Sequence, residues 1–276
     1  MPYRHANIFV GLTLVVIVAG FYGSYFTKMG EVPFAFHVHA FTATAWVALL
    51  MAQVWSIQNR KNALHKTVGK ASFFMFPLLI VGFMMIINHT AHRYETNDNP
   101  VTMAFGASFG IGMALAIFAY LLLYYLALKN RRNVRLHAGY MLMTPAVLFE
   151  SPFSRILLDY APWAIFTGSG FPQVVMDSIV ISMALVVVFC LALYVRFRAH
   201  GAPFLLTAGL ITVQGIIMYA APSVGWLRDG FAAFTHVPPA LSIALALGLG
   251  AGAAWLGWRD GGAPKQKPKR AFAPAE

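Results

Sequence analysis

Five histidines mark the two ends and the turn of a predicted hairpin of apolar segments. His37 and His39 begin the first segment, His89 and His92 end the second, and His65 lies in the basic turn between them. If both segments cross a bilayer, the first four histidines meet at its outer face. Imidazole is a common ligand for Zn, Cu and Fe. This face is therefore predicted to hold a divalent metal ion through these four histidines, or haem b.

Helical geometry refines this set of ligands. Residues three apart share a helix face, whereas residues two apart point ~200° away from each other. His89 and His92 are thus expected to point together, and either can pair with His39 around a haem. If His37 and His39 were both helical, their side chains would point in different directions. His37 is therefore expected just before the start of its helix. The alternative is that these histidines only hydrogen-bond loops and water at the interface. His39 shares its stripe with Thr42, Trp46 and Gln53, which predicts a bundle-facing side.

A second pair of histidines, His65 and His137, stands at the starts of two helices beside Lys and Arg residues. One interpretation is a second haem, since some b-type di-haem cytochromes place a histidine pair at each face of a four-helix core. Another is recognition of a phosphate headgroup by a basic turn at a helix N-terminus. We favour the simpler interpretation that the neighbouring cations set the topology.

Charged residues inside the predicted spans form a third candidate site. Glu150 is expected to lie deepest, while Arg155 and Asp159 are spaced i, i+4 and can pair. Asp177 lies about one turn inside the outer end of the next span. Charged groups at membrane depth are costly and usually serve transport, proton transfer or internal pairing.

The composition defines the elements that must position these residues. Of 276 residues, 59% are hydrophobic and only 11% charged, which is far more apolar than a soluble domain. The predicted fold is an all-α integral membrane protein, a bundle of about eight transmembrane helices. The net charge of +11 is explained by basic loops, so no nucleic-acid partner is expected. The spans are 8–26, 37–57, 68–89, 104–128, 141–160, 174–195, 204–221 and 240–258.

Basic residues alternate between the connecting loops. One set of loops and termini carries 16 of the 20 Lys and Arg residues, which places both termini in the cytoplasm. Residues 1–258 form a single transmembrane domain with its core in spans two to five, at about 37–160. Residues 259–276 are predicted to be a disordered basic cytoplasmic tail. A small-residue run beginning at Ala246 fits a homo-oligomer face as well as internal packing.

Short motifs resemble a known family. HKTVGK, beginning at His65, and HAGYMLMT, beginning at His137, are followed by Arg155. This order resembles a bacterial family of multi-span membrane proteins catalogued as a domain of unknown function, with an H-R-x-x-G-R turn and a later H-x-x-W-M segment. Lys66 and Lys70 replace its arginines, and Tyr140 replaces its Trp. The resemblance covers about 37–158 and implies a fold core without an established activity. The expected location is the bacterial inner membrane.

Three functions remain open from the sequence. The first is a membrane oxidoreductase with haem b or a metal, held by His39 and His89 and by His65 and His137, that exchanges electrons with a quinone or a periplasmic redox partner. The second is a transporter or small-molecule-binding membrane protein that uses Glu150, Arg155 and Asp177. The third is a metal-dependent membrane hydrolase, although no nucleophile motif supports it.

Overall fold

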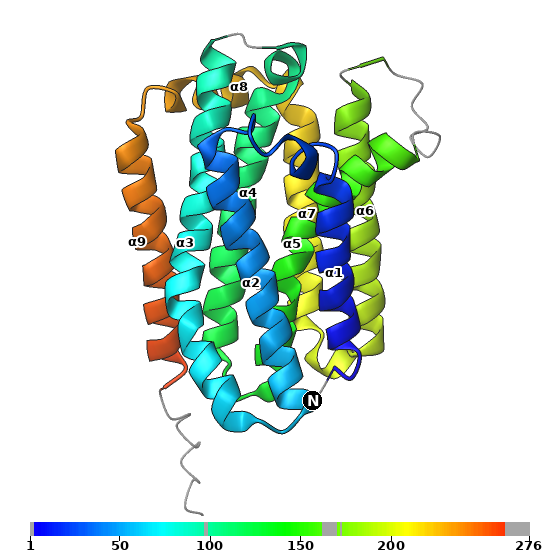
Figure 1. Ribbon diagram of the computed structural model, residues 1–276, viewed down its shortest axis with the longest axis vertical. Helices are drawn as coiled ribbons and strands as arrows, with labels where there is room; N and C mark the ends of the chain where they lie inside the picture. Colours follow the sequence, from blue (N-terminus) through cyan, green and yellow to red (C-terminus); the bar gives the residue numbers. More distant parts are fainter. Residues whose placement is uncertain (1–2, 97–98, 162–169, 172, 263–276) are drawn as a thin grey trace, which may run out of the picture.

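The computed structural model describes residues 3–96, 99–161, 170–171 and 173–262, and every regular element within them is helical. The helices stand side by side in one bundle (Figure 1). Seven of them are long and apolar enough to cross a membrane, so the predicted multi-pass membrane protein is confirmed. The elements are α1 (Ala6–Phe21), α2 (Phe34–Gln58), α3 (Asn62–Glu95), α4 (Pro100–Lys129), α5 (Val134–Tyr160), α6 (Gln173–Arg196), α7 (Ala202–Ala220), α8 (Gly225–Phe234) and α9 (Pro239–Asp260).

Helix α1 is shorter than the predicted span 8–26. It ends at Phe21, and the chain then turns into the short 3-10 segment Phe26–Lys28. Two glycines in this region, Gly20 and Gly23, disfavour a longer helix. At 16 residues, α1 is ~24 Å long and shorter than the ~30 Å hydrocarbon core. It nevertheless runs alongside the long helices and packs on α2 and α5 (Figure 1).

Both ends of the described chain lie at the same end of the bundle. The start of α1 and the end of α9 are at the bottom of Figure 1, beside the loop between α2 and α3. We call this the basic end, because its loops carry most of the Lys and Arg residues, and we call the opposite end the outer end. The predicted tail 259–276 falls mostly outside the described residues.

Aromatic side chains fill the centre of the bundle formed by α2–α5. Trp46 is fully buried, with its ring 5.3 Å from Phe76 and 5.5 Å from Tyr124. Phe76 stacks on Tyr124 at 4.0 Å. The indole Nε1 of Trp46 donates a 2.9 Å hydrogen bond to Thr144 Oγ1, which joins α2 to α5. This arrangement confirms the predicted bundle-facing side of α2.

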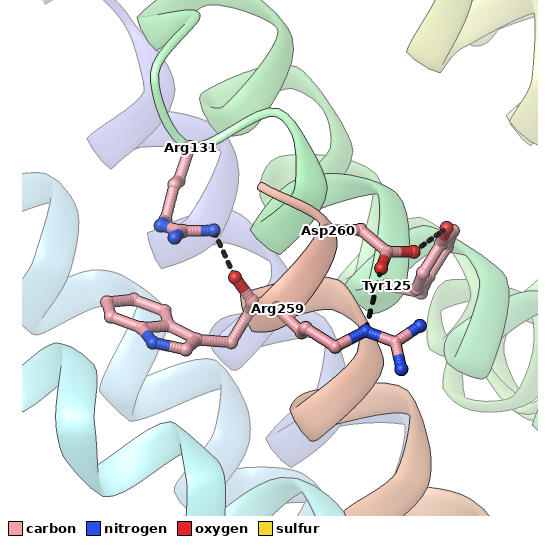
Figure 2. Close-up of polar contacts among 5 residues, drawn as sticks. Tyr125, Arg131, Arg259 and Asp260 are labelled. Carbon is pink, nitrogen blue, oxygen red and sulfur yellow. Dashed lines mark hydrogen bonds and ion pairs between the residues drawn. The ribbon is translucent and has the colours of Figure 1, made fainter. Parts of the chain in front are cut away.

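Polar contacts hold α9 against α4 at the basic end (Figure 2). The hydroxyl of Tyr125 donates to Asp260 Oδ2 at 2.8 Å, and Arg259 pairs with the other carboxylate oxygen at 3.2 Å. Arg131, which follows α4, donates to the carbonyl of Trp258 at 2.6 Å and stacks over its ring. Several basic residues of this end therefore hold helices together in addition to setting topology.

Helix α8 was not predicted, because its 10 residues are too few to span a membrane and no apolar run marks them. It lies at the outer end, between α7 and α9 (Figure 1). Its buried Phe231 packs against Gly110 of α4, where a larger side chain would overlap the ring.

Candidate functional site

The outer-face histidines contact different residues. Because α2 begins at Phe34, His37 is helical, contrary to the expectation that it precedes the helix. It therefore diverges from His39, and its Nδ1 lies 2.8 Å from the hydroxyl of Tyr25. His39 faces α3, where its ring lies 4.8 Å from that of Phe83.

The second half of the predicted outer site lies further along α3. His89 packs edge-on against Phe36 at 5.1 Å. Phe83 and His89 are six residues apart on α3, which is ~9 Å along the helix axis. The contact of His39 with Phe83 and the contact of His89 with Phe36 therefore lie at different depths in the bundle. His92 is also helical and shares the face of His89, as predicted. Among the described residues, no three His, Cys, Asp or Glu side chains gather as metal ligands. The outer metal site stays a prediction.

The inner histidines stand near the starts of α3 and α5, at the basic end. His65 of α3 and His137 of α5 interact electrostatically. His137 donates from Nδ1 to the carbonyl of Ala127 at 2.8 Å, and His65 hydrogen-bonds the backbone of Gln53. The remaining nitrogen of His65, Nδ1, is buried without a hydrogen-bond partner, as is Oε1 of Gln53.

Arg155 is the centre of the polar cluster on α5. Its Nη1 donates to the carbonyl and the hydroxyl of Ser151, at 2.8 and 2.9 Å. The guanidinium lies 4.7 Å from the ring of Phe21 at the end of α1. It interacts electrostatically with Glu150 and Asp159 of its own helix, and the i, i+4 ion pair with Asp159 stays a prediction.

Arg155 also interacts electrostatically with His39 of α2. Imidazole, guanidinium and carboxylate groups from α2 and α5 thus gather beside the end of α1. We call His39, Glu150, Ser151, Arg155 and Asp159 the Arg155 cluster. The sequence predicted His39 as a ligand of a metal ion or haem. It predicted Glu150, Arg155 and Asp159 as a separate charged site.

Two prolines shape the helix that carries this cluster. Pro145 has no N–H for the carbonyl of Met141, and the hydroxyl of Thr144 donates to that carbonyl instead, at 2.8 Å. Pro152 touches α1 at Gly20, where a Cβ atom would overlap the backbone of Pro152. The close approach of α1 to α5 places Phe21 over Arg155.

Asp177 lies apart from these residues in the chain, on α6. It is 4% exposed and accepts a 3.0 Å hydrogen bond from the amide of Gln173, one turn earlier. The prediction that Asp177 lies inside the protein, one turn from the outer end of its span, is confirmed. Gln173 was not predicted as part of a site, although it stands four residues before Asp177, the charged partner that it binds.

Comparisons with family models, curated proteins and solved structures find no match for this chain. The resemblance to the family of unknown function therefore rests on its motifs alone. The fold and the intramembrane charges define the class, a multi-pass helical membrane protein with ionisable groups inside its bundle.

Proposed function

We propose that this multi-pass membrane protein is a transporter or small-molecule-binding protein with its site at the Arg155 cluster. The observation that carries the proposal is that Arg155 interacts electrostatically with both His39 of α2 and Glu150 of α5, within the spans. Ionisable groups inside membrane bundles mark substrate paths, ion paths or proton relays, because burying them is otherwise selected against.

The local structure supports a binding role. The hydrogen bonds to Ser151 orient the guanidinium, and a planar guanidinium presents several N–H donors in a geometry that matches a carboxylate. The carboxyl group of Glu150 competes for the same cation. A small substrate with a carboxylate therefore fits the cluster, with Glu150 free to exchange a proton as the substrate displaces it.

The helices around the cluster also support movement. Proline-containing α5 and short α1 meet at the contact between Pro152 and Gly20, directly beside Arg155. Helices with proline interruptions often form the substrate sites of transporters, since they bend without breaking other packing. Rocking of α1 against α5 would open the cluster toward the outer end.

The test uses Arg155→Gln and Glu150→Gln with Arg259→Gln as the control, since among the described residues the exposed Arg259 contacts only residues of its own helix, Asp260 and the ring of Trp255. Thermal stabilisation by acetate, succinate, glutamate and lysine is measured for each purified variant. A bound probe at 100 times its Kd stabilises by ~2.7 kcal/mol. A carboxylate probe should stabilise the wild type and the control but not Arg155→Gln. Uptake of that probe into proteoliposomes then distinguishes a transporter from a binding protein. Equal responses in all variants would contradict the proposal.

One observation favours a second candidate, a redox protein with haem b or a metal ion at the basic end. His65 and His137 interact electrostatically, and each bonds a backbone group, as ligating histidines commonly do with their second nitrogen. A bound haem predicts a Soret band that is lost in both His65→Ala and His137→Ala. Elemental analysis of a colourless protein tests Zn, and spectra test Cu and Fe. We rank this function second because the predicted outer histidines contact different residues.

A further inference from the structure

A large cavity lies on the opposite side of α5 from Arg155. Its volume is about 780 Å³, within the range of small-molecule sites. Residues of α1 and α6 form its walls and residues of α5 form its floor, and α5 packs against both of these helices in the bundle (Figure 1). The residues that line the cavity are mainly apolar, and they include Phe9, Ala146, Phe149, Phe153, Leu185 and Phe189.

The cavity opens sideways, toward the lipid. Phe9 is 46% exposed and Leu185 is 48% exposed, although both line it. An apolar ligand can therefore enter between α1 and α6 from the bilayer. The lining of α6 extends from Leu185 to Arg196, which corresponds to ~16 Å at 1.5 Å per residue. This depth equals about half of the ~30 Å hydrocarbon core, or one leaflet.

The end of the cavity at the basic end is positively charged. Arg4, His5 and Arg196 line it, and none of the residues that line the cavity is acidic. Helix α1 begins there without an acidic residue in its first turn and without a side-chain cap, so its N–H groups and positive dipole end also favour an anion. Burial raises the pKa of Tyr3, so this phenol adds no negative charge to the mouth.

We call this cavity between α1 and α6 the groove. We propose that the groove binds one anionic phospholipid of the leaflet at the basic end, with the lipid phosphate at Arg4 and Arg196. Its acyl chains lie between α1 and α6 along the apolar walls. The phenol of Tyr3 donates to the carbonyl of Arg135 at 3.0 Å, which fixes the mouth of the groove against α5. An amphiphile fits both halves of the groove, whereas a soluble anion matches only the mouth.

The lipid site is independent of the proposed transport site. Arg155 follows Phe153 by two residues, so their side chains point ~200° apart on α5. Loss of lipid binding therefore leaves the Arg155 guanidinium in place, and changes at Arg155 leave the groove intact. Each proposal can fail without the other.

The test measures lipid retention by native mass spectrometry after reconstitution with equal phosphatidylglycerol and phosphatidylcholine. The wild type should retain phosphatidylglycerol preferentially. Arg4→Gln with Arg196→Gln should lower this preference by ~10–30-fold. Each cation near a membrane surface strengthens the binding of anionic lipid, and this double variant removes two of them. The control is Arg60→Gln with Arg132→Gln, which removes two exposed cations at the same end.

A second variant tests the apolar half of the groove. Ala146→Phe places a ring on its floor and should reduce retention of both lipids, while Leu247→Phe on the exposed face of α9 should not. If both double arginine variants lose the preference equally, general surface charge explains it and the proposal is overturned. Equal retention of the two lipids by the wild type, or unchanged retention in Ala146→Phe, would also overturn it.

Discussion

The contact between α1 and α5 at Gly20 predicts a large difference between two glycine substitutions on one helix. A Cβ atom at Gly20 would overlap the backbone carbonyl of Pro152, which cannot move without shifting α5. A Cβ atom at Gly11 would meet only the terminal methyl of Met51, at 3.3 Å, and this flexible side chain can yield. Gly20→Ala and Gly11→Ala therefore form a matched pair.

The expected difference in the free energy of unfolding follows from two opposing effects. Replacing a helical glycine by alanine gains up to ~1 kcal/mol from helix propensity, and this gain nearly cancels between the two variants. Overpacking costs ~1–3 kcal/mol, and it applies to Gly20→Ala alone. The free energy of unfolding should thus differ by ~1–3 kcal/mol between the variants, with Gly11→Ala equal to the wild type or slightly more stable.

The assay is thermal unfolding of both purified variants in the same detergent. At ~2–4 °C per kcal/mol, Gly20→Ala should melt ~2–12 °C below Gly11→Ala. Because Phe21 lies over Arg155, Gly20→Ala should also weaken binding at the Arg155 cluster. Equal melting temperatures would refute the close packing of α1 on α5 and, with it, the position of Phe21.

Three further predictions concern the core, the topology and the deepest acid. A double-mutant cycle of Trp46→Phe and Thr144→Val should give a coupling of ~0.6–1.7 kcal/mol in unfolding, since their 2.9 Å hydrogen bond is buried; a coupling of zero would mean that the bond does not form. A fluorescent protein fused after Asp260 should fold and fluoresce in the cytoplasm, and a periplasmic signal would show a miscounted span. Glu150→Leu should abolish transport while expression and binding of the carboxylate probe persist, because Glu150 exchanges the proton and competes with that probe for Arg155, whereas higher stability with unchanged function would mark Glu150 as a tolerated residue.

Apolar length and charge asymmetry predicted most of the fold. Seven spans agree with the structure within several residues, because ~20 apolar residues in a row have few other stable conformations. Both deviations arise where this signal is weak. Helix α1 ends early at its glycines, and α8 is held by the single buried ring of Phe231 rather than by a lipid-facing surface.

The candidate site was predicted in pieces. Helical spacing identified the inward face of His39 and placed Arg155 and Asp159 one turn apart on α5, because both depend only on local geometry. The proximity of His39 to Arg155 depends on how α2 packs against α5 through Trp46 and Thr144, and no local spacing encodes that contact. The groove between α1 and α6 was missed for the same reason.

The most direct test of the Arg155 cluster is its access to water from the outer side. Ser151→Cys is made after replacing Cys190, the one cysteine of the chain, with alanine. Its control is Ser182→Cys on α6. Ser151 and Ser182 each lie nine residues from the outer end of their helix, or ~14 Å deep, but Ser182 is completely buried.

Labelling by a membrane-impermeant anionic methanethiosulfonate, added from the outer side, is followed over time. A site around Arg155 that receives a small anion predicts rapid labelling of Ser151→Cys, protection by the carboxylate probe that stabilises the wild type, and no labelling of Ser182→Cys. Labelling of Ser151→Cys as slow as that of Ser182→Cys would contradict a binding site at the Arg155 cluster.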